Sequence, residues 1–180
     1  PPVPVITTIE TGFDNPQPEL TWTESSIATG YVVWLKNLTT GITLQNSINV
    51  PFNSYQPSAP LALGSYEFYV RARNEVGKSA WSPRFAFTVN SVVNIDLVPD
   101  GMQTRPKLSW QPLPGAVKFD IWLVDISMPS EPVIHVRTSS PQTSLIPPNQ
   151  LADGWYRLQV RGIALDGTLG RWSLGETFAV

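Results

Sequence analysis

The segment Gly64–Ser82 is the one around which the rest of the chain is organised, and its first part places apolar side chains at a spacing of two. The apolar side chains stand at every second position: Tyr66, Phe68, Val70 and Ala72. A period of two predicts a β-strand that buries one of its faces. The polar turn Asn74–Gly77 and the short run after it predict a hairpin that continues from this strand.

A closely similar pattern returns at Gly154–Ser173, so the chain contains an internal repeat. Further upstream, Leu20-Thr21-Trp22 reappears as Leu108-Ser109-Trp110. Matching segments lie about 90 residues apart, which predicts two tandem copies of one structural unit. We expect one domain at residues 1–89, a second at residues 93–180, and a short linker at residues 90–92.

Each copy is expected to form seven short strands separated by turns rich in proline and glycine. In the first copy they are placed at Val5–Ile9, Leu20–Thr23, Tyr31–Leu35, Ile42–Asn46, Ser54–Gln56, the stretch from Gly64, and Arg84–Val89. In the second copy they are placed at Asn94–Val98, Leu108–Gln111, Phe119–Val124, Val133–Thr138, Thr143–Ile146, the stretch from Gly154, and Glu176–Val180. Strands of this number and length predict an all-β fold in which two sheets pack as a sandwich.

Both copies resemble fibronectin type III domains. The motifs that carry the resemblance are Leu20-Thr21-Trp22, the tyrosine-corner segment Leu61–Tyr66, and the strand Tyr66–Asn74. The second copy departs from the family pattern, because Gly162 replaces the usual alanine and Leu165-Asp166-Gly167 replaces the Asn-x-x-Gly turn.

The resemblance implies two consecutive seven-stranded immunoglobulin-like sandwiches of the fibronectin type III kind. It also implies that Trp22 and Trp110 lie in the two cores. Tyr66 and Tyr156 are expected to hydrogen-bond backbone groups a few residues upstream.

Composition narrows the classes of protein and partner. Apolar residues make up 42% of the chain and charged residues 14%, which favours a packed core. A net charge of −2 argues against a nucleic-acid partner. The sequence contains no long apolar run, so we expect neither a membrane-spanning segment nor a signal peptide within it. The absence of cysteine excludes disulfides and thiolate metal sites.

Alternation also predicts which side chains point away from each core. In the first copy, one outward face should carry Trp34, Tyr69, Arg71, Arg73 and Trp81; in the second, its counterpart should carry Trp122, Arg157, Arg161 and Trp172. One interpretation is a structural stack of guanidinium groups on indole rings. Ser79-Ala80-Trp81-Ser82 supports it, because the segment resembles the Trp-Ser box of cytokine-receptor domains. The other interpretation is a binding platform for a sugar or a peptide.

No catalytic arrangement is predicted. His135 is the only histidine, so neither a catalytic triad in each copy nor a multi-histidine zinc site can form, and we expect it on a solvated edge strand. The acidic candidates for general acid–base chemistry are scattered: Glu67, Glu75, Asp120 and Asp125. No Asp-x-Asp-x-Asp spacing suggests calcium. We therefore expect no enzyme activity, no cofactor and no metal.

These observations predict a non-catalytic spacer or interaction module of a larger surface or secreted protein, monomeric and binding a protein or a glycan. Two alternatives remain: a carbohydrate-binding accessory of a secreted glycosidase, and a ligand-binding receptor ectodomain. Asn37-Leu38-Thr39 is a single glycosylation sequon. Together with a low lysine content, it favours an extracellular protein of bacterial origin.

Overall fold

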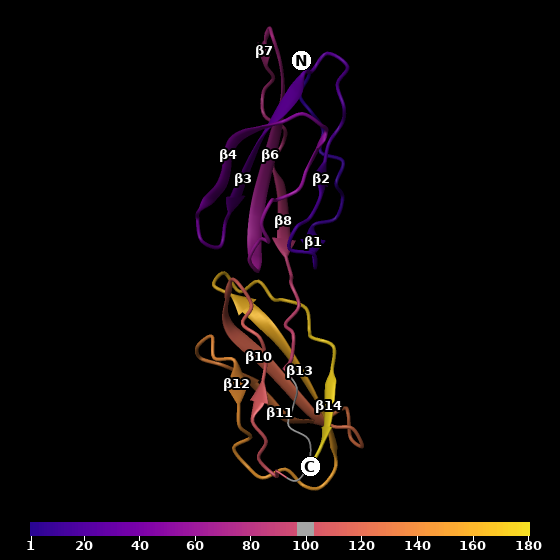
Figure 1. The fold of residues 1–180 in the computed structure, drawn as a ribbon, viewed down its shortest axis with the longest axis vertical. Helices are drawn as coiled ribbons and strands as arrows, with labels where there is room; N and C mark the ends of the chain where they lie inside the picture. Colours follow the sequence, from indigo (N-terminus) through magenta and orange to yellow (C-terminus); the bar gives the residue numbers. More distant parts are fainter. Residues whose placement is uncertain (97–102) are drawn as a thin grey trace. The chain divides into compact units, whose positions relative to one another are not determined.

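The computed structural model describes residues 1–96 and 103–180, and every regular element in these ranges is a β-strand (Figure 1). The chain divides into two compact units, Pro1–Asn90 (unit 1) and Ser91–Val180 (unit 2). Each unit has a larger and a smaller sheet whose inward side chains share one hydrophobic core. The predicted all-β, two-sheet sandwich is thus confirmed for both units.

In unit 1 the larger sheet has the strand order β1-β8-β6-β3-β4, with β7 paired to β6. Its strands are β1 (Gly12–Phe13), β3 (Gly30–Asn37), β4 (Thr43–Val50), β6 (Gly64–Asn74), β7 (Gly77–Lys78) and β8 (Phe85–Val89). The smaller sheet pairs β2 (Leu20–Thr21) with β5 (Ser54–Tyr55), and Ile6 bridges to Trp22 beside it.

In unit 2 the larger sheet has the order β11-β10-β13-β14. Its strands are β10 (Ala116–Asp125), β11 (Pro132–Arg137), β13 (Trp155–Ala164) and β14 (Glu176–Ala179). The smaller sheet pairs β9 (Leu108–Ser109) with β12 (Ser144–Leu145), and Ile95 bridges to Trp110.

A buried tryptophan lies at the centre of each core, as the resemblance implies. Trp22 belongs to the smaller sheet, but its ring contacts Tyr31 at 5.4 Å and Phe68 at 5.9 Å between ring centroids, and both of these residues belong to the larger sheet. Trp110 packs in the same way on Phe119 at 5.6 Å. Large aromatic side chains supply much of a small core, so these indoles couple the two sheets of each unit.

The first strand of each unit differs from the prediction. Strands were expected at residues 5–9 and 94–98, but the structure has single bridges at Ile6 and Ile95, and residues 97–98 lie outside the described ranges. In unit 1 the reason is visible in the pairing. The chain leaves the smaller sheet after Thr8, and at Gly12 it begins to pair in parallel with β8 of the larger sheet. A segment that changes sheets cannot form a long strand in either one.

The tyrosine corners are present in both units. The Tyr66 hydroxyl donates to the carbonyl oxygen of Ala62 at 2.7 Å and accepts from Nδ2 of Asn37 at 3.1 Å. The Tyr156 hydroxyl donates to the carbonyl oxygen of Ala152 at 2.9 Å. Burial raises the pKa of Tyr156, and the Asp125 carboxylate raises this pKa further, so the hydroxyl stays a donor.

Asn37 is the acceptor residue of the predicted glycosylation sequon, yet its side chain is buried inside unit 1. Its Nδ2 donates to the Tyr66 hydroxyl, and its Oδ1 accepts the backbone N–H of Thr40 at 3.0 Å. A glycan on Asn37 would have to break this arrangement. The sequon is therefore a structural element of the folded unit.

We expect Tyr66→Phe to lower the free energy of unfolding of unit 1 by about 1–3 kcal/mol, because the change removes the hydroxyl that bonds both the Ala62 carbonyl and the buried Asn37 amide. Tyr156→Phe is the matched control, since that hydroxyl serves one carbonyl, and it should cost less. Chemical denaturation of the two variants measures both values, with circular dichroism checking that the fold is unchanged. Equal stability of Tyr66→Phe and the parent chain would contradict the corner.

Candidate functional site

The outward face of the larger sheet of unit 1 gathers aromatic and basic side chains. Buried and less buried positions alternate along β6, and the register pairs Trp34 of β3 with Tyr69, and Val32 with Arg71. Val32 is the exception on this face, because it is 1% exposed and forms its floor. The outward residues Trp34, Tyr69, Arg71 and Arg73, together with Trp81, are called the aromatic face below.

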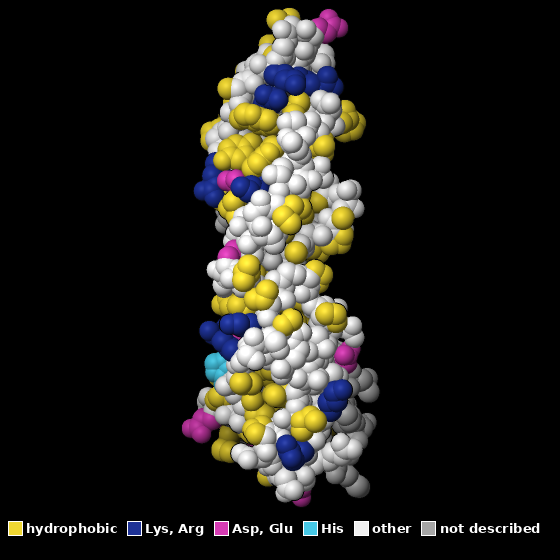
Figure 2. Space-filling view, turned by 90° about the vertical axis from the view of Figure 1, so that its left-hand side faces the viewer, with side chains coloured by type: hydrophobic (Ala, Val, Ile, Leu, Met, Phe, Trp, Pro, Cys, Tyr) yellow, Lys and Arg dark blue, Asp and Glu magenta, His cyan; other side chains and the backbone are white. Residues whose placement is uncertain are grey.

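Three rings of the aromatic face enclose an open depression. Trp34 and Tyr69 meet edge to face, with ring centroids 5.5 Å apart and planes at 63°. With Trp81 they line a depression of about 240 Å³. Figure 2 shows hydrophobic side chains gathered on unit 1 next to Lys and Arg side chains.

Trp81 is held by hydrogen bonds on either side of it. The Ser82 hydroxyl accepts the backbone N–H of Val70 at 3.1 Å, and the Ser79 hydroxyl accepts that of Ala72 at 3.0 Å. The guanidinium carbon of Arg71 then lies 4.3 Å from the centroid of the Trp81 ring, within the range of a cation–π contact. The predicted stack is therefore present, and its Trp81 ring forms one wall of the depression.

Unit 2 repeats the stack but adds a buried carboxylate. Arg161 lies over Trp172 at 4.4 Å, and Ser173 accepts the N–H of Val160 at 2.9 Å. Beside them, Asp120 of β10 is fully buried, although it occupies an outward position of the strand. The same position in unit 1 is held by Val32.

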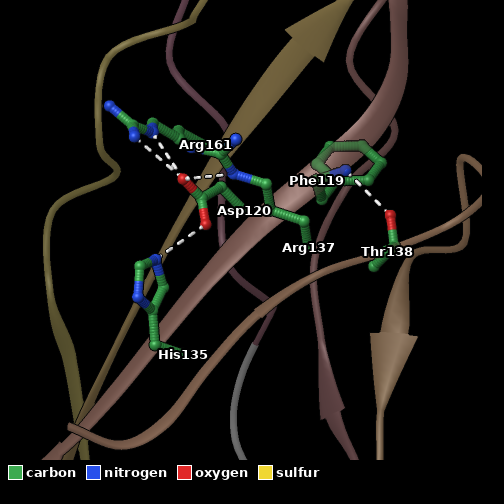
Figure 3. Close-up of polar contacts among 6 residues, drawn as sticks. All are labelled: Phe119, Asp120, His135, Arg137, Thr138 and Arg161. Atoms are coloured by element: carbon green, nitrogen blue, oxygen red, sulfur yellow. Dashed lines mark hydrogen bonds and ion pairs between the residues drawn. The ribbon is translucent and has the colours of Figure 1, made fainter.

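Three cationic or titratable side chains surround Asp120 (Figure 3). Arg161 Nη2 lies 2.8 Å from its Oδ2, and Arg137 Nε lies 3.5 Å from the same oxygen. Nε2 of His135 lies 3.1 Å from its Oδ1. The register explains the cluster, because Asp120 stands directly opposite Arg137 on β11 and Arg161 on β13.

Comparisons with known proteins support the fold at low sequence identity. No family profile and no curated protein matches this sequence. A two-domain fibronectin type III segment of chicken tenascin matches with a TM-score of 0.75 and 13% identity, over 98% of this chain and 99% of that one. The alpha chain of the chicken interferon gamma receptor matches with a TM-score of 0.58 and 14% identity, over 98% of this chain and 97% of that one. This chain has the fold of two consecutive fibronectin type III domains.

In the second fibronectin type III unit, the sequence analysis did not predict that Arg137 and His135 contact Asp120. Arg137 was not among the predicted face residues, and His135 was expected to be solvated. His135 does lie on an edge strand with its side chain 45% exposed, but it bonds Asp120, and its ring meets that of Trp122 at 4.8 Å. Only the register of β11 against β10 reveals these contacts, because β11 has no clear alternation of its own.

The remaining predicted residues are less closely associated with the two stacks. Arg73 of the first fibronectin type III unit is half-buried opposite Gly30. Arg157 of the second unit stands opposite Val124 and lies about 13 Å along β13 from Arg161. The structure therefore brings Arg161, Trp172 and Trp122 to the cluster around Asp120 but leaves Arg157 apart.

Other functional features are sparse in residues 1–96 and 103–180. These ranges contain no group of three or more acidic or histidine side chains able to hold a metal ion. Within the same ranges, no helix is long and apolar enough to cross a membrane.

We expect Asp120→Asn to lower the free energy of unfolding of the second fibronectin type III unit by about 1–3 kcal/mol. Removing one partner of a buried ion pair costs more than this, but the three partners here are 20–61% exposed and water screens them. Arg137→Ala is the control and should cost less than ~1 kcal/mol, because that side chain is 61% exposed. Urea denaturation measures both; an Asp120→Asn midpoint equal to that of the parent would contradict a stabilising role.

Proposed function

We propose that this chain is a non-catalytic, monomeric interaction module of a larger extracellular or cell-surface protein. Its role is protein–protein interaction or adhesion, and the aromatic face of unit 1 is its binding surface. The observation that carries the proposal is the open depression between Trp34, Tyr69 and Trp81. The three rings are half-buried, and aromatic rings beside arginine are typical of the centre of a protein interface.

The size and composition of the depression favour a protein partner. Small-molecule sites usually span ~300–1,000 Å³, and about 240 Å³ suits a single inserted side chain. Tryptophan, tyrosine and arginine are also the residues enriched at the energetic centres of protein interfaces. A glycan is the second candidate, since the half-buried rings of Trp34 and Trp122 offer stacking surfaces to a sugar.

The similar structures support an extracellular location, since one is a segment of tenascin and the other a receptor chain. The receptor ectodomain remains an alternative role, favoured by the stacks on Trp81 and Trp172. A bacterial source agrees with the burial of Asn37, whose sequon a eukaryotic secretory pathway would otherwise modify.

Selection from a displayed peptide library on the whole chain tests the proposed function. We expect peptides to be enriched on the parent chain and lost on Trp34→Ala, while Trp122→Ala in unit 2 serves as the matched control. A glycan array probed with the same three proteins tests the second candidate. The absence of any Trp34-dependent ligand in both experiments would overturn the proposed surface.

We also propose that residues 1–89 and 93–180 are independent domains joined at residues 90–92. Each unit has its own core, which supports the proposal. Expressed separately, each piece should unfold cooperatively with a midpoint close to its transition in the whole chain. Ser91 and Val93 are buried in unit 2, so a second piece beginning at Ser91 is the control for damage at the cut. A first or second piece that remains unfolded would contradict independent domains.

A further inference from the structure

Each unit stacks an arginine on a tryptophan, but among the described residues only the arginine of unit 2 pairs with a carboxylate. Arg71 stacks on Trp81 and Arg161 on Trp172 at nearly equal distances, 4.3 and 4.4 Å. In unit 2, Nε and Nη2 of Arg161 both donate to Asp120. In unit 1 the residue opposite the arginine is Val32, which offers no acceptor.

Arg71 and its neighbour Arg73 have no carboxylate partner among the residues that the structure describes. The Nε atoms of both side chains are buried and have no hydrogen-bond partner in that part of the chain. Buried polar groups without a partner are uncommon in folded proteins and call for an explanation. In unit 2 the equivalent stacked arginine, Arg161, donates from its Nε to a carboxylate, and unit 1 lacks that acceptor in the described structure.

The charge around the aromatic face is strongly positive, although the whole chain has a net charge of −2. The strands of the larger sheet of unit 1 carry a single acidic residue, Glu67, and it is already paired with Arg84 at 2.9 Å. Lys36, Arg71 and Arg73 stand at outward positions of β3 and β6, on the same sheet face as the depression, and have no such partner in the described structure. This arrangement complements a ligand that is acidic and carries one large apolar group.

From these contacts we propose that the aromatic face of unit 1 binds an acidic peptide segment of a partner protein. One aromatic side chain of the segment enters the depression between Trp34, Tyr69 and Trp81, and its flanking carboxylates pair with Arg71 and Arg73. Unit 2 does not bind this segment, because Asp120 already neutralises Arg161, and Gln159 stands where unit 1 has Tyr69. This inference rests on the proposed function and names the chemistry of its partner.

Nuclear magnetic resonance titration of the whole chain tests the proposal with defined peptides. The main probe is a short peptide of aspartates around one central tryptophan. Its controls replace the aspartates by lysines, or the tryptophan by alanine. We expect chemical-shift changes confined to β3, β6 and the Trp81 segment, with the aspartate–tryptophan peptide alone binding clearly. Its affinity should fall several-fold between ~50 and ~500 mM salt, because exposed charge pairs are screened.

The decisive variant transfers the internal carboxylate of unit 2 into unit 1. Val32→Asp combined with Asn49→Arg reproduces the facing pair Asp120–Arg137, since Val32 stands opposite Asn49. We expect this double variant to lose affinity by about tenfold or more, as for a charge-assisted hydrogen bond that is no longer available. If it does not fold, Arg71→Gln tests the same contact, and Arg161→Gln is its matched control in unit 2.

Several results would overturn the inference. Equal binding by the lysine peptide, unchanged affinity in both unit 1 variants, or shifts of equal size in unit 2 would each do so. No binding at millimolar peptide would also overturn it, as would Trp34-dependent binding of an oligogalacturonate with no peptide binding. The proposed function is decided separately, because a Trp34-dependent consensus without acidic residues would support that function and overturn the acidic partner.

Discussion

The contact of Trp22 with the larger sheet determines what the outward face of unit 1 can present. Its indole packs on Tyr31 and Phe68, which fixes the inward parity of β3 and β6. Successive side chains of a strand point to opposite faces, so a slip of one residue would exchange core and surface. Trp34 and Tyr69 therefore point outward because their neighbours are needed in the core. The outward position of the aromatic face is a consequence of core packing.

Alternation was enough to predict the sandwich and the long central strands. It predicted which side chains of β6 are buried and which point outward, because both follow from a period of two. The first strands could not be predicted correctly, since the parallel pair at Gly12–Phe13 spans two residues and has no periodic signal. Gly64 and Gly154 also look equivalent in sequence. In the structure Gly64 has φ of +148°, and a Cβ there would collide with Oγ1 of Thr39, so this position requires glycine. A Cβ at Gly154 would make only ordinary contacts with Tyr156 and Asp125.

Alternation also predicted part of the candidate site. Parity placed Trp34, Tyr69 and Arg71 on one face, and the stack on Trp81 followed from the resemblance to the Trp-Ser box. Asp120 stands two residues before the outward Trp122 on β10, but alternation could not show that its carboxylate would be buried. That burial depends on Arg137 and His135, which reach Asp120 from an edge strand whose own pattern is irregular. Contacts across an edge depend on register, and register is set by tertiary packing.

Stability alone does not account for the difference between Val32 and Asp120. A buried ion pair is often no more stabilising than apolar residues of similar volume, because desolvation offsets much of the attraction. Asp120 and Val32 do differ in whether they offer the stacked arginine an acceptor for its hydrogen bonds. In unit 2, Asp120 supplies Arg161 with an internal carboxylate acceptor. Val32 supports the Arg71–Trp81 stack from below but leaves the charge of Arg71 uncompensated in the described structure. The two units therefore use the same arginine–tryptophan stack with different support beneath it, a carboxylate in unit 2 and a valine in unit 1.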